Sequence, residues 1–409
     1  MGIPKIRFKG YTEDWEQRKL GDIYGSIGNA FVGTATPYYA EQGHFYLESN
    51  NVKDGQINHN SEIFINDEFY EKQKDKWLHT GDMVMVQSGH VGHAAVIPEE
   101  LDNTAAHALI MFRNPKEEIE PYFLNYEYQT DKAKKEIENI TTGNTIKHIL
   151  ASDMQEFVVD VPKYEEQKVI AGYFCNIDNL ITLHQRKCEE TKKLKKYMLQ
   201  KMFPQNGQSV PQIRFAGFTE DWEQRKLSEC AGFRRGSFPQ PYGNKDWYDG
   251  EGAMPFVQVA DVASDMQLVE DTKQKISKLA QPLSVFAEKG SVLVTLQGSI
   301  GRVAITQYGA FVDRTVLIFD KYAENIDKRF WAYIIKEKFE DEARKAPGGT
   351  IKTITKEALS DFELKIPSYK EQGKLADYLI DLDHLITLHQ RKCDELQNIK
   401  KYMLQNMFV

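Results

Sequence analysis

Two stretches of the sequence occur twice, and this duplication limits the possible folds more than any other feature. The segment at 177–203 reads IDNLITLHQRKCEETKKLKKYMLQKMF, and the segment at 382–408 reads LDHLITLHQRKCDELQNIKKYMLQNMF, a shift of 205 residues. A second block, IPKIRFKGYTEDWEQRKL at 3–20, returns as VPQIRFAGFTEDWEQRKL at 210–227, a shift of 207 residues. Repeats of this length and identity indicate an A–B–A′–B′ chain.

Composition narrows the class of protein. The 409 residues suffice for two or three domains with their own cores, and the formal net charge of −8 gives no bulk attraction for nucleic acid. Any such binding would come from local basic patches. The four cysteines are scattered without a CxxC pair, which favours a reducing compartment. The first residues lack the apolar core of a signal peptide, and no apolar run is long enough to span a membrane. We therefore expect a cytoplasmic protein.

Between the repeated blocks lies a first variable unit with alternating strand and turn signals. We expect strands at His44–Leu47, Met83–Val86, Ala94–Ile97, Leu109–Phe112 and Phe157–Val161. One helix is expected from about Pro121 to Glu138, with the proline in its first turn.

A second variable unit repeats this plan with mostly different residues. A strand at Leu293–Leu296 leads into the turn 297–302, as 84–86 leads into 88–93, and a helix is expected at Lys328–Lys345. The two units therefore share an α+β fold and differ at their loops. The predicted division is a first domain at 1–160, a long helix at 161–207, a second domain at 208–366 and a second long helix at 367–409.

Each variable unit feeds a long helix with a heptad pattern. One row is Ile170, Ile177, His184, Thr191 and Met198, and the next is Tyr173, Leu180, Lys187 and Leu194. The second helix has Leu375, Leu382, His389, Leu396 and Met403, with Tyr378, Leu385, Lys392 and Ile399. Such rows are typical of a coiled-coil seam, so we expect the two helices, each about 58 Å long, to pair. Ser368 and Glu371 suggest a capping box at the second start.

The repeat also predicts how the helices pair. Similar units in one chain tend to pack about a pseudo-twofold axis, which makes the helices antiparallel. His184 and His389 would then face each other, as a polar pair that fixes the register rather than as ligands. By the same symmetry, Ile3–Leu20 should dock against the end of the second helix near Met407 and Phe408.

No sequence pattern supports catalysis or cofactor binding. The chain lacks GxxxxGK[ST], GxGxxG between a strand and a helix, HExxH, GxSxG and CxxC motifs. His90 and His93 form an HxxH pair, but no nearby acid or cysteine completes a metal site. We assign no catalytic residue, no metal and no cofactor.

The loops of the variable units carry residues suited to DNA contact. Arginine can bond to guanine edges, and hydroxyl and lysine side chains can contact phosphate. Most candidates recur at matching places in the two copies, on the turns between strands and on the loop before the last strand, whereas Arg234 and Arg235 have no basic counterpart in the first unit. They are Ser88, His90, His93, Thr145, Lys147, Arg234, Arg235, Ser237, Gln297, Ser299, Arg302, Thr350 and Lys352.

Identical residues that an apolar seam does not require suggest a repeated partner. A helix seam requires matching apolar positions but not a matching surface. A recent duplication could also explain the identical surface, but it would have left the variable units identical too, and these units have diverged. We therefore expect two copies of one partner at equivalent sites. The candidate contacts are Trp15, Arg18, Arg186, Lys187, Trp222, Arg225, Arg391 and Lys392.

Three motifs give the chain a family resemblance over nearly its whole length. Pro162–Gln167 and Pro367–Gln372 both read Pro-x-x-x-Glu-Gln at the start of a long helix. The sequence GSIGRVA begins at Gly298, and the first unit keeps its glycines but has His93 in place of Arg302. A Thr-Ile-Lys turn begins at Thr350. With these motifs the chain resembles the specificity subunit of type I restriction–modification systems.

The resemblance implies a function. Each domain would read one half of a split site on double-stranded DNA through the major groove, and the helices would act as a ruler for the unread spacer. Two methyltransferase (modification) subunits carrying S-adenosylmethionine would dock on the repeated helices and methylate adenine. Restriction subunits would join for ATP-driven translocation and cleavage. The chain itself would be noncatalytic.

Two other classes of protein stay open at this point. The chain could be a nuclease or methyltransferase of unfamiliar type, which assays of the purified chain would detect. It could instead be an adaptor whose helical hairpin bridges two proteins without reading DNA, in which case duplex binding would be absent even with a methyltransferase present.

Overall fold

The computed structural model describes residues 2–143, 147–205, 207–345 and 359–409, and the side chains of 343–345 lie outside this description. The chain divides into two compact units. Unit 1 comprises Met1–Arg186 with Gln390–Val409, and unit 2 comprises Lys187–His389. Each unit thus contains one variable region, one half of each long helix and one of the repeated blocks. They are described separately below.

Unit 1 is built on two four-stranded sheets. One has the order β2-β11-β8-β9 and the other β10-β4-β7-β3. The first contains β2 (Tyr24–Asn29), β11 (Leu109–Pro115), β8 (Met83–Val86) and β9 (Ala94–Val96). The second contains β10 (Ala105–Ala106), β4 (His44–Leu47), β7 (Phe64–Ile65) and β3 (Tyr39–Ala40). A two-stranded pair joins β1 (Glu16–Lys19) to β12 (Val158–Val161). The expected strands are confirmed, with ends that agree within one residue except for β11, which runs three residues beyond Phe112.

The expected single helix at 121–138 is wrong in one respect. The structure has two helices, α3 (Pro121–Glu127) and α4 (Asp131–Ile140). Thr130 separates them because its side chain accepts a hydrogen bond from the Ala133 amide and so caps a new helix. The apolar pattern ran through this cap, and periodicity alone did not reveal the break.

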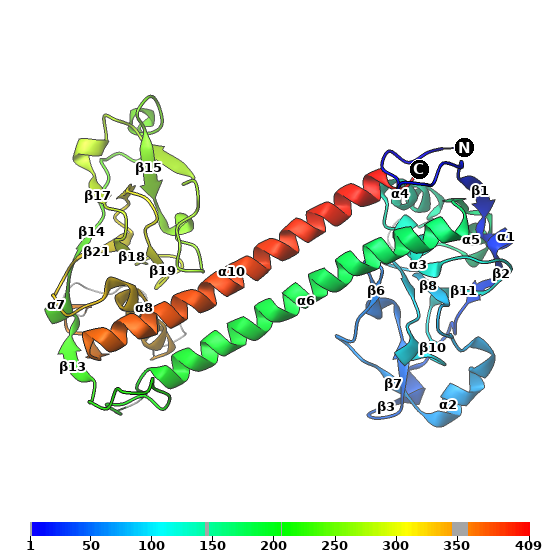
Figure 1. Cartoon of the computed structure of the whole chain (residues 1–409), viewed down its shortest axis with the longest axis horizontal. Coiled ribbons are helices and arrows are strands. Elements are labelled where there is room, and N and C mark those ends of the chain that lie inside the picture. The colour runs from blue at the N-terminus through cyan, green and yellow to red at the C-terminus, as the bar shows by residue number, and fades with distance from the viewer. Residues whose placement is uncertain (1, 144–146, 206, 346–358) are drawn as a thin grey trace. The chain divides into compact units, whose positions relative to one another are not determined.

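Unit 2 repeats the arrangement, with sheets ordered β14-β21-β18-β19 and β16-β15-β20-β17. The first contains β14 (Ala231–Arg235), β21 (Val316–Tyr322), β18 (Val292–Thr295) and β19 (Val303–Ile305). The second contains β16 (Gln274–Ile276), β15 (Met254–Val257), β20 (Ala310–Val312) and β17 (Val285–Ala287). A further pair joins β13 (Glu223–Lys226) to β22 (Glu363–Ile366). Helix α8 (Lys328–Lys345), confirmed as expected, contacts β18 and β19 (Figure 1).

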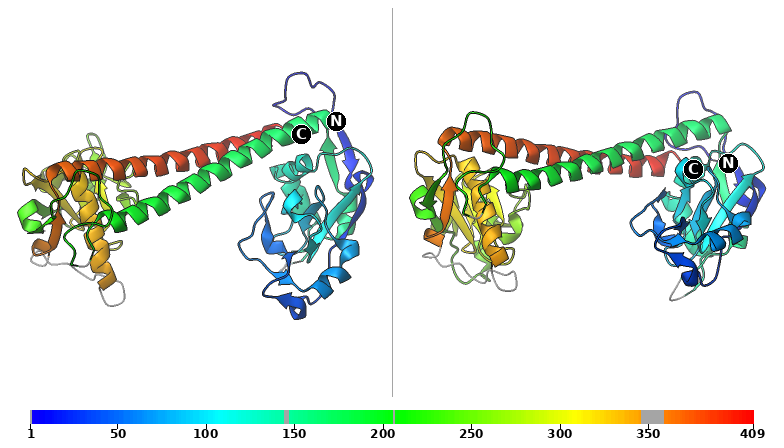
Figure 2. Two further views of the ribbon diagram at one scale, coloured as in Figure 1. Left: turned by 60° about the horizontal axis from the view of Figure 1, so that its bottom comes forward. Right: turned by 90° about the horizontal axis from the view of Figure 1, so that it is seen from below.

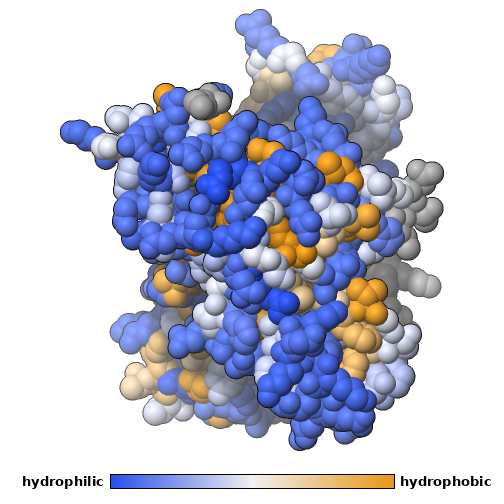
Figure 3. All heavy atoms as spheres, turned by 90° about the vertical axis from the view of Figure 1, so that its right-hand side faces the viewer, coloured by the Kyte–Doolittle hydropathy of each residue, from blue (hydrophilic) through white to orange (hydrophobic). Residues whose placement is uncertain are grey.

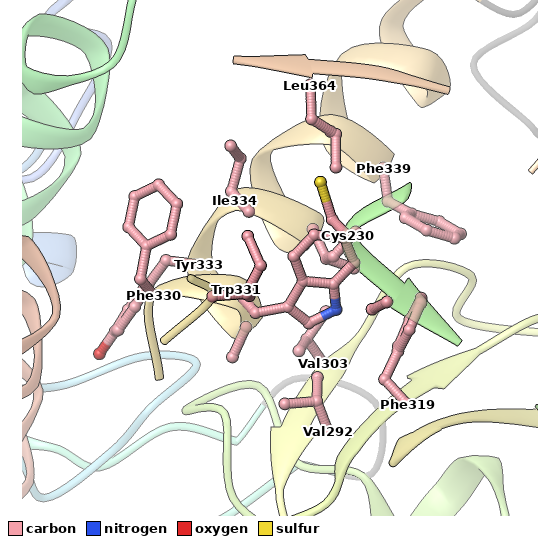
Figure 4. Packing of buried hydrophobic residues seen from close by; sticks show 14 of the residues in the cluster. Cys230, Val292, Val303, Phe319, Phe330, Trp331, Tyr333, Ile334, Phe339 and Leu364 are labelled. Carbon is pink, nitrogen blue, oxygen red and sulfur yellow. The ribbon is translucent and has the colours of Figure 1, made fainter. Parts of the chain in front are cut away.

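The core of unit 2 is centred on Trp331 of α8. Its indole is fully buried and meets the Phe319 ring edge-on, with 5.4 Å between centroids. Figure 4 shows Val292 and Val303 of the sheet on one side of the indole and Leu364 of β22 on another. This packing holds α8 against the sheet, so the strand turns are presented on a rigid support.

Both expected long helices are present. They are α6 (Tyr164–Met202) and α10 (Tyr369–Asn406), drawn as unbroken green and orange-to-red ribbons in Figure 2. In unit 1 the Cys393 thiol lies 3.7 Å from the Ile181 carbonyl, and Lys400 reaches Asp178. In unit 2 Cys188 lies 3.8 Å from the Ile386 carbonyl, and Lys195 reaches Asp383. Rising numbers on one helix meet falling numbers on the other, so the antiparallel pairing is confirmed within each unit. A contact of His184 with His389 would join the units, and it stays a prediction.

One row of the expected seam is wrong. The buried companion row lies four residues after the first row, at Phe174 and Cys188, and not three residues after it, at Leu180 and Leu194. Phe174 packs on Tyr126 of α3 and on Phe408, with ring centroids 5.0 and 5.8 Å apart. Packing against α3 and Phe408 therefore determines which side of the helix is buried, and the heptad count could not include those neighbours.

The first repeated block docks as expected. The Ile6 amide donates to the Asn406 carbonyl at 2.8 Å, and Trp15 meets the Phe408 ring edge-on at 6.0 Å. In unit 2 the Ile213 amide donates to the Lys201 carbonyl at 2.9 Å, and Trp222 meets Phe203 at 5.8 Å. Each repeated block thus covers the end of a long helix in the same way.

The Glu-Gln motif holds each unit together. Gln167 donates to the Pro162 carbonyl and accepts from the Glu120 amide, which ties the end of β12 to the start of α3. Gln372 makes the same two bonds to Pro367 and Asp327. The neighbouring Glu371 carboxylate, assigned above to a capping box, accepts two hydrogen bonds from Arg214. These motif residues are therefore structural.

One face of the molecule is mainly polar (Figure 3). The face in Figure 3 is covered mostly by hydrophilic residues, with hydrophobic ones in small groups. Over the described residues, every helix is too short or too polar to cross a membrane.

Candidate nucleic-acid and partner interfaces

The turn between β8 and β9 carries three candidates in unit 1. The Val86 amide donates to the His93 carbonyl and the Gly92 amide donates to the Val86 carbonyl, at 2.8 and 3.1 Å. His90 is exposed at the tip, and Ser88 and His93 are half-buried. Gly89 and Gly92 have φ of 78° and 87°, the left-handed region that favours glycine. A Cβ on Gly92 would also lie 2.9 Å from Ile137, so this glycine lets the turn sit against α4.

The segment containing Lys147 is hydrogen-bonded to this turn. The Gly89 amide donates to the Lys147 carbonyl at 3.1 Å, and the Ile149 amide donates to the Gln87 carbonyl at 3.0 Å. The Lys147 ammonium lies 2.7 Å from Glu138 at an exposed position. The fold thus brings Ser88, His90 and Lys147 together, whereas Thr145 lies outside the described residues.

His93 faces away from the tip. Its Nδ1 accepts from the Asp54 amide at 3.2 Å, and the Asp54 carboxylate lies 3.8 Å away. Burial lowers the pKa of His93, which favours the neutral ring that can accept this bond. His93 therefore holds the neighbouring turn, and its candidacy as a base contact is weaker than that of His90.

The turn between β18 and β19 has the same hydrogen-bond pattern in unit 2. Amides of Thr295 and Gly301 donate to the carbonyls of Arg302 and Thr295 at 3.0 and 2.9 Å. Gln297, Ser299 and Arg302 are exposed. The Thr295 hydroxyl donates to the Ser299 carbonyl, which anchors the tip. Arg302 also donates to the Val262 carbonyl at 3.3 Å, on the turn that corresponds to the one His93 contacts.

The end of β14 lies at the same end of the sheet as this turn. Arg235 pairs with Leu317 and Thr295 pairs with Val316, so both strand ends are level across β21. Arg235 is exposed and Ser237 is half-buried. Arg234 is engaged elsewhere, since its guanidinium binds Asp320 at 2.6 Å and the Phe286 carbonyl at 2.8 Å. Thr350 and Lys352 lie outside the described residues.

Two of the expected partner contacts are wrong. Trp15 and Trp222 are 0% and 3% exposed, and they pack in the cores of their units. A tryptophan is the largest side chain available to fill the corner between a repeated block and a helix end, so its identity in both copies reflects packing. Arg18 pairs with Glu117 at 2.9 Å and Arg225 donates to Asn325 at 3.1 Å, at partly exposed sites.

The remaining partner candidates lie on exposed helix positions. Arg186, Lys187, Arg391 and Lys392 are all exposed on α6 and α10. They flank a set of apolar side chains, half of which belong to the heptad rows that were expected to form the seam. These are 41% to 58% exposed: Leu180, Leu183, Ile399 and Tyr402 in unit 1, and Leu385, Leu388, Leu194 and Tyr197 in unit 2. Each member of one set is the repeat of a member of the other. The missed signal was that apolar residues occupy more helix rows than one seam requires.

The described residues offer little for catalysis. Within them no three His, Cys, Asp or Glu side chains are grouped to hold a metal ion. A groove of about 1270 Å³ in unit 2 runs between α6, α8 and β22, and a smaller one of about 240 Å³ in unit 1 runs between α10 and the β8–β9 turn. Lysines and carboxylates line both grooves together with apolar residues, without a nucleophile paired to a base.

Comparison with known proteins gives a consistent match. The family model "Type I restriction modification DNA specificity domain" matches residues 12–193 and 219–398. A putative type I restriction enzyme MjaX specificity subunit from Methanocaldococcus jannaschii is 25% identical over 96% of this chain and 92% of its own length. The MjaVIII specificity subunit of the same organism is 22% identical over 96% of this chain and 91% of its own.

Solved structures share the fold. The S subunit of a type I restriction–modification system from M. genitalium covers 100% of this chain and 99% of its own, with a TM-score of 0.66 and 14% identity. A chain from a structure concerned with complex assembly and conformational transition of the type I R-M system covers 96% of this chain and 97% of its own, with a TM-score of 0.53 and 18% identity.

Proposed function

The chain belongs to the family of type I restriction–modification DNA specificity domains, and from this premise we propose that it is the sequence-specific DNA-binding subunit of such a system. It reads a bipartite site on double-stranded DNA and directs adenine methylation, and restriction, by partner subunits. Residues 1–160 and 208–366 are the two target-recognition domains, and 161–207 and 367–409 are the helices that fix the unread spacer.

One observation carries this proposal. The two units present equivalent turns of the same backbone geometry, and their side chains differ: half-buried Ser88 and exposed His90 in one, and exposed Gln297 and Ser299 in the other. Side chains on a narrow hairpin can enter the major groove, where each base pair offers a distinct donor and acceptor pattern. Lys147 and Arg302 add positive charge beside these tips for phosphate or guanine. Two rigid and similar supports with different tips suit the reading of two different half-sites.

The partner is a methyltransferase (modification) subunit, bound in two copies. The exposed apolar set around Leu180 in unit 1 recurs around Leu385 in unit 2, and basic residues flank both sets. Exposed leucine and tyrosine side chains in a repeated pattern suit the docking of an apolar helix face. The partner carries the S-adenosylmethionine, and restriction (translocase) subunits join the assembly.

The subunit is noncatalytic and binds no cofactor of its own. The four cysteines carry thiols, as suits the reducing interior of a cell, and the DNA target favours a cytoplasmic location. The partners supply part of the positive charge that an acidic chain requires near DNA.

Methylome sequencing with and without this gene tests the proposal. A bipartite methyladenine motif should vanish on deletion and return on complementation. The purified chain alone should show neither methyl transfer nor cleavage. An unchanged methylome in a strain with active modification subunits would contradict the DNA-reading function. Normal assembly without any duplex binding would favour a helical adaptor instead.

A further inference from the structure

A three-residue cluster joins the recognition domain of unit 1 to both long helices. Asp178 of α6 accepts from the Tyr126 hydroxyl of α3 at 2.8 Å and lies 2.8 Å from the Lys400 ammonium of α10. The same ammonium stands 5.1 Å from the centroid of the Tyr126 ring. The side chains of Asp178 and Lys400 are each only 13% exposed. One carboxylate therefore ties together three elements that are far apart in the sequence.

Unit 2 contains the same cluster. Asp383 of α10 accepts from the Tyr333 hydroxyl of α8 at 2.7 Å and lies 2.5 Å from Lys195 of α6. The Lys195 ammonium stands 5.2 Å from the Tyr333 ring centroid. The helices have exchanged roles, since α10 now supplies the aspartate and α6 the lysine. The two variable regions differ at most other positions, but both place a tyrosine at this point.

The geometry of the cluster holds the two long helices and the variable region together, and it also fixes their positions relative to one another within the unit. Apolar side chains along a helix can slide past one another with modest loss, but charge-assisted hydrogen bonds require close contact and alignment. A slip of one helical turn moves an attachment point by about 5.4 Å and breaks the pair. The tyrosine adds a second constraint, because it fixes the recognition domain to the same carboxylate. Each cluster therefore fixes both the helix register and the place of the domain on the helices.

We propose that Asp178 and Asp383, each with its tyrosine and lysine, are positioning residues that set the spacer length the protein accepts between half-sites. This inference rests on the proposed function. DNA makes a full turn in about 10 base pairs, so one added base pair lengthens the spacer by about 3.4 Å and rotates the second half-site by about 34°. A domain held rigidly on the helices cannot bind a half-site that is displaced and rotated in this way. A domain released from its aspartate can move and bind it.

The test uses the full chain with its modification subunit. A plasmid set carries both half-sites with the natural spacer and with spacers one base pair shorter or longer, and methyladenine is measured at each. The wild type should favour the natural spacer strongly. In Asp178→Asn and Asp383→Asn, the ratio of natural to altered spacers should fall about tenfold, the effect of losing one charged hydrogen bond. Tyr126→Phe removes only the hydroxyl and should lower the ratio in the same direction.

The matched control is Glu165→Gln. It removes an exposed ion pair with Lys168 from the same helix in the same unit, and its spacer ratio should equal that of the wild type. Methylation that falls in parallel on all three spacers, in both Asp178→Asn and Tyr126→Phe, would overturn the inference and leave a merely structural cluster. An unchanged ratio would overturn it too. A wild type without bipartite methylation would instead contradict the proposed function.

Discussion

Arg7 and Glu166 form a two-pronged ion pair in which Nε and Nη2 each lie 2.7 Å from a carboxylate oxygen. The Glu166 side chain is 1% exposed, and the Arg7 guanidinium also donates to the Glu13 carbonyl at 2.6 Å. Arg214 and Glu371 repeat the pair in unit 2. The glutamate of the Pro-x-x-x-Glu-Gln motif thus clamps the repeated N-terminal block onto the start of a long helix.

Glu166→Gln should destabilise unit 1 by about 3–5 kcal/mol, because it leaves the Arg7 charge largely buried without its carboxylate. Chemical denaturation, with hydrogen exchange to locate the loss, measures this. Glu165→Gln, next along the chain and exposed, should have almost no effect. Glu371→Gln should give the same loss in unit 2. Equal stability of Glu166→Gln and Glu165→Gln would contradict the clamp.

Stability of unit 1 should depend on Glu127 between about pH 5 and pH 8. Burial raises the pKa of Glu127 from 4.5 to about 8, the Asp160 charge adds to the rise, and the Asp160 amide and Lys132 oppose it. The folded state therefore holds the neutral acid while the unfolded chain ionises near its ordinary pKa. The contribution is full below the unfolded pKa and is lost as pH rises through the folded one.

Thermal unfolding at a series of pH values tests this assignment. Relative to the wild type, Glu127→Gln should show a flatter decline of stability from pH 5 to pH 8, because glutamine does not titrate. The corresponding residue in unit 2 is Ile334, which is buried and cannot ionise. Parallel pH curves for the two proteins would show that Glu127 is not the titrating group.

Trp15→Ala should lower the stability of unit 1 by about 3–5 kcal/mol, the range for removing a large aromatic side chain from a core. Its indole packs on Phe123 and Phe408 with ring centroids 5.5 and 6.0 Å apart. Trp15→Phe should lose less, since the buried Nε1 has no hydrogen-bond partner among the described residues. Denaturant unfolding compares them. A stable Trp15→Ala protein that fails to bind its partner would restore the original surface assignment.

Leu180→Asp should weaken partner binding at unit 1 and leave folding nearly intact. Leu180 is 44% exposed, so a charge there costs little in the free chain and much in an apolar interface. Leu385→Asp should do the same at unit 2. Mass photometry with the modification subunit should detect one bound copy for each single variant and none for the double. Full occupancy by the double variant would place the interface elsewhere.

Arg302→Ala should relax base preference in one half-site only. A bidentate arginine contact contributes about 1–3 kcal/mol of discrimination, so the methylation motif should degenerate in the half that unit 2 reads. His90→Ala should act on the other half. Methylome sequencing reports both halves in one experiment. Arg234→Ala is the control, because Asp320 and the Phe286 carbonyl already bind that guanidinium.

Much of the fold could be predicted from the sequence. The strands around the β8 and β18 turns, helix α8 and the docking of residues 3–20 on Met407 and Phe408 all follow from local patterns and from the repeat. The break between α3 and α4 was not predicted, because the hydrogen bond from the Ala133 amide to the Thr130 side chain starts a new helix without interrupting the apolar periodicity. Among the candidate site residues, His90, Gln297, Ser299 and Arg302 are exposed on strand turns, as the turn pattern predicts. Ser88 and His93 on the same kind of turn are half-buried, because neighbouring segments pack on them.

The sequence by itself determined the duplication, the two long helices and the turns that differ between the units, because each of these features depends on a continuous stretch of residues. The tertiary structure alone decided which helix row is buried and that Trp15 is core. It also decided that Arg7 meets Glu166, 159 residues away. The physical reason is that burial and ion pairing depend on neighbours brought by folding. Leu180 and Phe174 are both apolar on one helix, and only the packing of Tyr126 and Phe408 determines which of them is buried.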